Sequence, residues 1–421
     1  MKKTPLYQWH IDNGAKMAEF AGYSMPLWYP QGARTEHISV IEHAGLFDTS
    51  HMAVLLIQGD GAHQLLQLAF SKDLDRCLGL KKTPLVQGRS VYGVFLNERG
   101  HVIDDAIVTR QAESLYTVVV NAGMGGTISD HLRQLPTVAP VEVVDLSDKL
   151  GKIDIQGPAS ADILGRLLQD PAGVYTGFPY FSSKGWFDLS QPKSVLLADG
   201  TPILLSRTGY TGEFGFEIFL EPRHLEKVWG ALLEEGGDRI CPCGLASRDS
   251  LRAGAMLPLS HQDIGGWPFK ANPWQFALPV DERGVFTKRF IGAEALLHTE
   301  KVQFTFPFAG FDPRKIVPGE NTAVLDGEGR KVGSILTCAT DMAIGRAGER
   351  IVSLATAVTD GRPEDFKAKG LCCGFVMVSE KFSPGAQLFL TDGKRKIPIE
   401  IREEIRPDRT ARRTMREMFH N

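Results

Sequence analysis

Apolar and polar positions alternate over short runs in the first half of the chain, which predicts strands interspersed with helices. A three-residue spacer, Glu98-Arg99-Gly100, separates two of these runs, a spacing typical of a β-hairpin. The predicted elements are, in order, a strand over Ala53–Ile57, a helix over His63–Phe70, strands over Ser90–Asn97, His101–Arg110 and Leu115–Asn121, and a helix that ends near Leu135.

A strand, an Ile-Gln-Gly turn and a helix occur twice along the chain. Leu55–Phe70 resembles Lys152–Leu168, and the hairpin Leu96–Arg110 resembles Leu196–Arg207. Patterns this short also arise by coincidence. If the repeat is real, it predicts two related α+β halves that face each other across a ligand cleft.

The second half changes from helices to short strands. Glu221–Gly236 predicts an amphipathic helix, Cys243–Arg252 the start of another, and the aromatic run Trp267–Ala277 a packed linker. The last segment, Arg402–Asn421, is rich in arginine, which favours a solvated helix or tail. Turns separate the strands that predict a small antiparallel barrel, namely Thr305–Gly310, Ala323–Leu325, Val332–Thr337, Cys372–Val378, Gln387–Leu390 and Ile397–Ile401.

Composition is that of a globular protein with two or three domains. The chain has 421 residues, a hydrophobic share of 43% and a net charge of −3, which gives no general attraction to nucleic acid or anionic membrane. No apolar run is long enough to span a membrane, and no apolar segment follows the first lysines, so we expect a cytoplasmic protein. The six cysteines lack the spacing of a zinc site, and we expect free thiols and no bound metal.

The run SRTGYTGEFGFE, Ser206–Glu217, combines three glycines with Tyr210, Glu213 and Glu217. Glycines allow tight turns and close approach of a ligand, and a carboxylate next to an apolar strand is unusual for an ordinary solvated Glu. A loop before an amphipathic strand would show the same pattern. The density of polar groups favours a small-molecule site.

Two further groups could carry chemistry. Asp104 and Asp105 lie in an apolar strand, and alternation places them on opposite faces, so we do not expect them to act as a paired acid and base. At least one is predicted to be functional, although an Asp bonded to nearby backbone fits equally well. Arg248 and Arg252 are one helical turn apart and could hold an anion together, as could arginines in ordinary surface ion pairs.

A competing pattern is similar to a dinucleotide-binding unit. A strand, a G-x-G-G turn, a helix and a second strand ending in Asp145 follow each other over Leu115–Asp145. The third glycine of the fingerprint is replaced by Ile128. The incomplete fingerprint keeps an NAD-dependent oxidoreductase as a remote alternative.

Several motifs span nearly the whole chain, namely TPLYQWHIDNGAKMAEFAGYSMPLWY, AGLFDTSHM, LNERGHVIDDAIV, VVVNA, IQGP, SRTGYTGEFGFEI, CGLASRDSLR and KRFIGAEAL. As a set, they resemble the glycine cleavage T-protein family of tetrahydrofolate-dependent aminomethyltransferases. The resemblance implies an α+β fold of two related domains, 1–145 and 146–300, with interleaving of the two allowed, and a C-terminal antiparallel β-barrel, 301–421, around a central folate channel.

The resemblance also implies roles for individual residues. Asp105 would lie by the reactive nitrogens of folate as the catalytic carboxylate, Glu217 would bind the amino edge of the pterin, and Arg248 would meet the anionic glutamate tail. The remaining residues implied to line the folate pocket are Tyr210, Asn121, Tyr92 and Met52.

Departures from the family pattern concern the donor of the one-carbon unit. In the family run R-D-S-L-R-L-E-A-G-L-P-L-Y-G, Gly254 replaces the Glu and Ser260 replaces the Tyr, and further on Lys270 replaces a Glu. We expect these changes on the substrate side of the folate channel, where Lys270 would suit an anionic donor. The barrel carries an extra stretch near Gly345–Lys369. The residues predicted on the substrate side are Arg252, Ser260, Lys270 and Trp274.

The sequence thus predicts a tetrahydrofolate-dependent one-carbon transferase, with aminomethyl transfer as the leading function. A demethylase that passes a methyl group from a small sulfonium or methoxy compound to folate is the alternative. A non-catalytic folate-binding protein is more remote, because the K-G-C-Y-x-G-Q-E signature is absent. We expect the partner to be a small one-carbon donor or a lipoyl-carrier protein, and neither nucleic acid nor membrane. The oligomeric state is not indicated.

Overall fold

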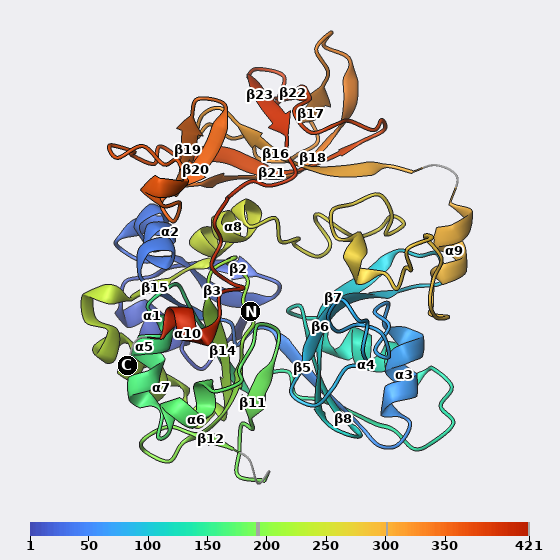
Figure 1. Cartoon of the computed structure of the whole chain (residues 1–421), viewed down its shortest axis with the longest axis vertical. Coiled ribbons are helices and arrows are strands. Elements are labelled where there is room, and N and C mark those ends of the chain that lie inside the picture. Colours follow the sequence, from blue (N-terminus) through green and yellow to red (C-terminus); the bar gives the residue numbers. More distant parts are fainter. Residues whose placement is uncertain (191–193, 300–301, 420–421) are drawn as a thin grey trace.

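The computed structural model describes residues 1–190, 194–299 and 302–419. Two sheets with their helices lie side by side, and a barrel formed by the later part of the chain covers one end of both (Figure 1). This α+β arrangement confirms the predicted fold class.

The first sheet has the strand order β6-β7-β8-β5-β9, and all its pairs are antiparallel. Side chains such as Leu55, Phe95 and Val118 are fully buried in its core, which α3 and α4 help to enclose. Its elements are β5 (Ala53–Gln58), α3 (Ala62–Ala69), β6 (Ser90–Leu96), β7 (Val102–Ala112), β8 (Leu115–Val120), α4 (Gly125–Arg133) and β9 (Glu142–Asp145).

The second sheet follows the order β11-β13-β14-β10-β4-β15, with β12 on the same edge of β13 as β11. Strand β4 precedes the whole first sheet in sequence, so the two α+β units interleave along the chain. The elements of this unit are β4 (Gly45–Asp48), β10 (Gly151–Gln156), α5 (Ser160–Leu167), α6 (Pro171–Tyr175), β11 (Ser183–Gly185), β12 (Val195–Leu196), β13 (Pro202–Ser206), β14 (Gly215–Leu220), α7 (Pro222–Gly236), η1 (Gly237–Arg239) and β15 (Cys241–Cys243).

The predicted internal repeat is confirmed by the strand order. A hairpin, its return strand and the strand of the Ile-Gln-Gly motif are neighbours in both sheets, as β6-β7-β8-β5 and as β12-β13-β14-β10. Both motif glycines have positive φ, 116° at Gly59 and 124° at Gly157. A Cβ at either position would lie 2.4 Å from a backbone oxygen, that of Pro140 or of His43, which explains why glycine recurs in this turn.

The predicted barrel is also confirmed. Its strands close in the order β16-β21-β18-β17-β22-β23, around a core that includes Phe308, Val376 and Leu390. The strands are β16 (Phe304–Gly310), β17 (Ala323–Leu325), β18 (Lys331–Asp341), β21 (Leu371–Val378), β22 (Gln387–Thr391) and β23 (Lys396–Ile401).

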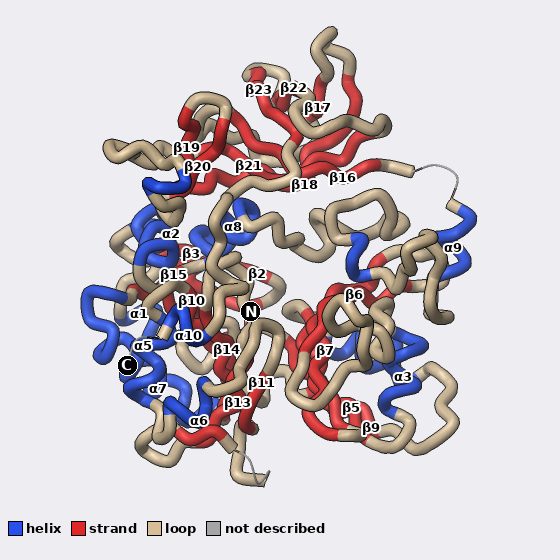
Figure 2. The backbone as a smooth tube through the Cα atoms, viewed as in Figure 1, coloured by secondary structure: helices blue, strands red, loops and turns tan. Residues whose placement is uncertain are grey.

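Smaller elements connect these three parts. The long segment between α8 and α9 is mostly loop (Figure 2), and it buries Phe269 and Trp274, as expected for the packed linker. The remaining elements are β1 (Lys2–Lys3), α1 (Tyr7–Asp12), β2 (Lys16–Phe20), β3 (Tyr23–Trp28), α2 (Gly32–Glu42), α8 (Leu245–Gly254), η2 (Gln275–Ala277), α9 (Ala293–His298), β19 (Ile344–Ala347), β20 (Arg350–Ser353), η3 (Val358–Asp360) and α10 (Met415–Met418).

The extra stretch near Gly345–Lys369 contains a separate hairpin, β19-β20, followed by a loop. Leu354 and Ala355, directly after the hairpin, pack with residues of α2. The hydroxyl of Thr356 donates to Asp408 at 2.5 Å, so this stretch also contacts the C-terminal segment.

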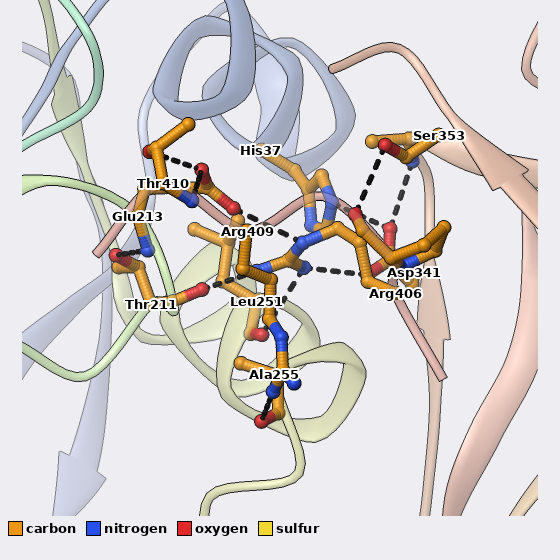
Figure 3. Close-up of polar contacts among 12 residues, drawn as sticks. His37, Thr211, Glu213, Leu251, Ala255, Asp341, Ser353, Arg406, Arg409 and Thr410 are labelled. Carbon is orange, nitrogen blue, oxygen red and sulfur yellow. Dashed lines mark hydrogen bonds and ion pairs between the residues drawn. The ribbon is translucent and has the colours of Figure 1, made fainter. Parts of the chain in front are cut away.

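The expectation of a solvated C-terminal helix or tail is wrong for Arg406, Met415 and Met418, which are buried, and holds for the exposed Arg412, Arg413 and Arg416. The Arg406 side chain is fully buried, and it donates to Glu213 Oε1 at 3.2 Å and to Asp341 Oδ2 at 2.6 Å (Figure 3). Met415 and Met418 pack into the core of the second sheet. The arginine-rich composition was misleading because carboxylates from distant elements satisfy the buried guanidinium. Residues 420–421 of the predicted segment lie outside the described residues.

Candidate functional site

A cavity of about 1460 Å³ lies between the two sheets. Strands β7 and β8 contribute to one wall, β10, β14 and α8 to the other, and the segment before α10 also lines it. Most of the residues singled out from the sequence meet here, namely Met52, Tyr92, Asp105, Asn121, Tyr210, Glu217, Arg248 and Trp274.

Asp104 and Asp105 share one hydrogen-bond donor although they alternate along β7. The Nδ2 of Asn121 donates to Asp104 Oδ1 at 2.8 Å and to Asp105 Oδ1 at 2.6 Å. Strand β8 ends at Val120, so the backbone N–H of Asn121 has no ladder partner, and Asp104 Oδ2 accepts it at 2.9 Å. Asn121 therefore links Asp104 and Asp105 although they alternate along the strand, and the expectation that they do not act as a paired acid and base stays a prediction.

Asp105 is the carboxylate that faces the cavity. The Tyr92 hydroxyl donates to its Oδ2 at 2.9 Å. Burial, followed by the negative charge of Asp104, raises the pKa of Asp105 to about 7. A carboxyl group that titrates near neutral pH at a cavity wall can hold a proton or stabilise a positive charge there.

His261 lies next to Asp104. Its Nε2 is 3.5 Å from Asp104 Oδ1, and the contact with Asp104 raises the pKa of the His261 imidazole. The residue has a φ of 65°, which is uncommon for a side chain with a Cβ. His261 was not predicted from the sequence, because its partner Asp104 lies 157 positions away in the chain.

Glu217 lies on the opposite wall within a group of buried charges. It pairs across the sheet with Asp154 of β10, and the Nζ of Lys152 lies 3.4 Å from Glu217 Oε1. Burial raises the pKa of Glu217, whereas the positive charge of Lys152 lowers it. Lys152 and Asp154 were also missed, although they alternate with Ile153 and Ile155 in a fully buried strand. That pattern signals polar groups on an enclosed face.

The glycine-rich loop before β14 wraps around Gln156. A Cβ at Gly209 would lie 2.1 Å from Gln156 Oε1, and a Cβ at Gly215 would lie 2.4 Å from the carbonyl oxygen of Ile155. These contacts bring Tyr210 to the cavity wall, where its hydroxyl donates to the Pro258 carbonyl and the Arg248 guanidinium lies 4.9 Å from its ring centre. The glycines therefore allow the close packing that places Tyr210 at the cavity wall.

Among the residues predicted on the substrate side, Trp274 lines the cavity and three others have different surroundings. Arg252 is fully buried in ion pairs with Asp249 and Asp263. The Lys270 ammonium donates to the Leu296 carbonyl at 3.0 Å. Ser260 is buried, and its hydroxyl has no hydrogen-bond partner among the residues that the structure describes.

Gly254, one of the departures from the family pattern, lies beside the buried Arg406 instead of the cavity. A Cβ at this position would be 1.8 Å from Asp341 Oδ2 and 2.9 Å from Arg406 Nη1. The space next to the end of α8 is filled by the Asp341 carboxylate of the barrel. The expectation that this change surrounds the substrate is wrong.

The dinucleotide-binding alternative is contradicted by the first sheet. Strands β8 and β9 do not pair with each other, because the antiparallel strand β5 lies between them. Asp145 Oδ1 accepts the backbone N–H of Ser147 at 2.8 Å, which is a turn contact. A dinucleotide-binding βαβ unit requires its two strands to be parallel neighbours, whereas β5 lies between β8 and β9 and runs antiparallel to both.

Across 1–190, 194–299 and 302–419, no three His, Cys, Asp or Glu side chains are grouped to hold a metal ion. Over the same ranges, none of the helices has the length and apolarity to cross a membrane. The six cysteines are free thiols.

Comparisons with known proteins agree on one family. A family model described as the GCVT N-terminal domain matches residues 6–272. An aminomethyltransferase of Thermus thermophilus is 36% identical over 340 residues, which cover 80% of this chain and 86% of that protein. One of Staphylococcus epidermidis is 32% identical over 296 residues, 70% of this chain and 74% of that protein. A crystal structure of glycine cleavage system aminomethyltransferase T from Bartonella henselae matches with a TM-score of 0.74 and 26% identity, over 98% of this chain and 99% of that chain.

Proposed function

The chain belongs to the glycine cleavage T-protein family of aminomethyltransferases, and we propose that it transfers an aminomethyl group to tetrahydrofolate bound in the cavity between the two sheets. The family and the one-carbon transferase activity follow from the similarity to curated aminomethyltransferases over most of their length. The identity of the donor, the cofactor and the roles of the site residues are the parts proposed here.

The cavity suits a folate in size and chemistry. Its volume of about 1460 Å³ exceeds the usual range of small-molecule pockets, roughly 300–1,000 Å³, which leaves room for an elongated ligand. Glu217 offers two carboxylate oxygens at the inner wall for N–H groups of a pterin edge. Besides Arg248, arginines of the C-terminal segment at the same cavity supply positive charge for an anionic glutamate tail, namely Arg412, Arg413 and Arg416.

Asp105 carries the mechanistic part of the proposal. Tetrahydrofolate, when bound, supplies the amine nitrogens that accept the one-carbon unit. Asp105 in its ionised form stabilises the positive charge that develops as that unit leaves its donor. Tyr92 and Asn121 fix the carboxylate by two hydrogen bonds, so that it need not reorient during the reaction. The single observation that supports this role is the raised pKa of a cavity-facing carboxylate.

The direct test is turnover of tetrahydrofolate with an aminomethyl-lipoyl carrier protein, for the wild type and Asp105→Ala. We expect kcat to fall about 10²–10³-fold, the usual cost of losing one preorganised electrostatic group. Folate affinity should change little, because Glu217 and Arg248 remain. Unchanged kcat in Asp105→Ala would refute the role of this residue.

A panel of small methylated sulfonium and methoxy donors distinguishes the demethylase alternative. The proposal predicts turnover with the lipoyl carrier and none with the panel. Lys270, which suggested an anionic donor, has its ammonium on the Leu296 carbonyl. Turnover with a panel member and none with the lipoyl carrier would refute aminomethyl transfer and support the demethylase alternative.

A further inference from the structure

Two carboxylates lie directly opposite each other at the inner wall of the cavity. Asp154 and Glu217 are cross-strand partners in the antiparallel pair β10-β14. Their exposed fractions are 0% and 6%. Like charges at such positions repel each other, and burial increases the repulsion because little water screens it. Something must compensate these charges if both side chains are ionised.

Lys152 lies between the two carboxylates. It is two residues before Asp154 on the same face of β10, and its Nζ is 2.6 Å from Asp154 Oδ1 and 3.4 Å from Glu217 Oε1. The Thr49 hydroxyl accepts from the same Nζ at 3.1 Å and donates to Asp154 Oδ1 at 2.8 Å. The ammonium is therefore fixed in place and is 2% exposed.

Arg248 balances the other side of Asp154. Its Nη1 donates to Asp154 Oδ2 at 2.9 Å, and its guanidinium lies over the Tyr210 ring. The group thus contains two acids and two bases, and it is neutral only when Glu217 is ionised. Loss of the Lys152 charge would leave an excess negative charge, which Glu217 can remove by taking up a proton.

We infer that the Lys152–Asp154 pair is a positioning device that keeps Glu217 a carboxylate with a fixed orientation, so that the pocket selects a ligand edge with two adjacent N–H donors. This inference rests on the proposed function, in which that edge belongs to the pterin. A protonated Glu217 would present one O–H donor and one acceptor, and it would lose one of the two hydrogen bonds to such an edge.

The charged and titratable groups that face Glu217 shift its pKa in opposite directions. Burial raises its pKa and Asp154 raises it further, whereas Lys152 and Arg248 lower it. Tyr180, on the segment before β11, also interacts electrostatically with Glu217, and burial raises the pKa of its phenol, so it stays neutral. Among these charges, Lys152 has the largest effect on the pKa of Glu217, so Lys152 is the residue to change.

The test measures the affinity of tetrahydrofolate for the full chain between pH 6 and 9. Lys152→Met should weaken binding about 10- to 100-fold near pH 7, the cost of one hydrogen bond to a charged group. Affinity should recover as pH rises, because Glu217 then ionises without help. Lys152→Arg keeps the charge and should retain more affinity at pH 7. The control Lys149→Met removes a nearby exposed lysine and should leave the affinity unchanged.

The double variant Lys152→Met with Asp154→Asn separates charge balance from simple loss of structure. It removes one charge of each sign and leaves Glu217 with Arg248, so it should bind better at pH 7 than Lys152→Met alone. The inference is overturned if Lys152→Met binds like the wild type, if its deficit is the same at every pH, or if the double variant is no better than the single one.

Failure of the inference and failure of the proposed function have different signatures. If the wild type does not bind tetrahydrofolate, both are overturned. If the wild type binds it and Asp105→Ala loses turnover, but Lys152→Met shows no pH-dependent deficit, only the inference is overturned.

Discussion

Two neighbouring carboxylates, Glu213 in the glycine-rich loop and Glu217 in β14, belong to buried ionic clusters of different kinds. Glu213 accepts from Arg406 and from the Thr410 hydroxyl, at 3.2 and 2.7 Å, in a cluster that also contains Asp341 and whose three charged side chains are fully buried (Figure 3). Glu217, four residues later, lies at the wall of the large cavity. Glu213 therefore stabilises the fold, whereas Glu217 is placed to bind a ligand.

The difference lies in what remains available to a ligand. The Arg406 guanidinium distributes its donors among Glu213, Asp341 and the backbone oxygens of Thr211 and Leu251. This cluster joins the second sheet, α8, the barrel and the C-terminal segment. At Glu217, the ammonium of Lys152 lies on one side only, and the carboxylate still faces the cavity. A buried charge is thus a candidate binding group when part of its hydrogen-bonding capacity points into a cavity.

The largest expected effect on the closed cluster comes from Arg406→Met. Removing the guanidinium leaves Glu213 and Asp341 buried without their partner, which should cost about 3–5 kcal/mol of unfolding free energy. Urea unfolding measures this loss. Arg402→Met is the matched control, because its partly exposed ion pair with Glu400 should contribute about 1 kcal/mol or less. Equal losses in the two variants would contradict the claim that the cluster around Arg406 stabilises the fold more than a partly exposed ion pair does.

Gly254→Ala should have a smaller effect on the same cluster. The added Cβ would lie 1.8 Å from Asp341 Oδ2, so the carboxylate must move away from Arg406. We expect a loss of about 1–3 kcal/mol, as for overpacking of a well-filled core. Gly230→Ala in α7 is the control, since no atom lies within 4 Å of its Cβ, and alanine should stabilise that helix by roughly 0.5–1 kcal/mol. A neutral Gly254→Ala would show that the cluster is loosely packed.

Asp104→Asn tests the cavity wall through the pH dependence of kcat/KM. Because the pKa of Asp105 is raised to about 7, its ionised form accumulates only above that pH, and kcat/KM should rise through neutrality. Removing the negative charge of Asp104 lowers the pKa of Asp105, so the acid limb should move to lower pH by about one unit, which corresponds to about 1.4 kcal/mol. A limb that stays in place, or moves up, would contradict the coupling of the two carboxylates.

The unfolding free energies of the wild type and of Asp104→Asn should also depend differently on pH. A carboxyl group whose pKa is raised by folding stabilises the protein fully below its unfolded pKa, and this contribution is lost as pH rises through about 7. Asp104→Asn should therefore lose less stability than the wild type between pH 4 and 7. Asp130→Asn, an exposed change on α4, should leave both profiles unchanged.

Local patterns in the sequence predicted the local parts of the fold. The hairpin β6-β7, the repeated strand-turn-helix and the barrel strands follow from alternation and from glycine turns within short stretches, and all are present. The resemblance carried by the motifs supplied the family. These features depend on neighbouring residues, which is why they can be read from a single chain.

Long-range partners could not be predicted in the same way. Glu213 and Arg406 are 193 positions apart, and nothing near either residue indicates the other. The arginine-rich C-terminus therefore predicted an exposed segment, although one of its arginines, Arg406, is fully buried. Lys152 did carry a local signal, since a lysine and an aspartate alternate there with isoleucines, but the identity of its third partner, Glu217, depends on the strand pairing.

The most direct measurement compares Glu213→Gln with Glu217→Gln in two assays, urea unfolding and tetrahydrofolate binding. Glu213→Gln should lower the unfolding free energy by about 1–3 kcal/mol and leave folate affinity within a few-fold of the wild type. Glu217→Gln should weaken folate binding about 10- to 100-fold with little loss of stability. The opposite result, with folate binding lost in Glu213→Gln and retained in Glu217→Gln, would contradict the assignment of the cavity wall as the folate site.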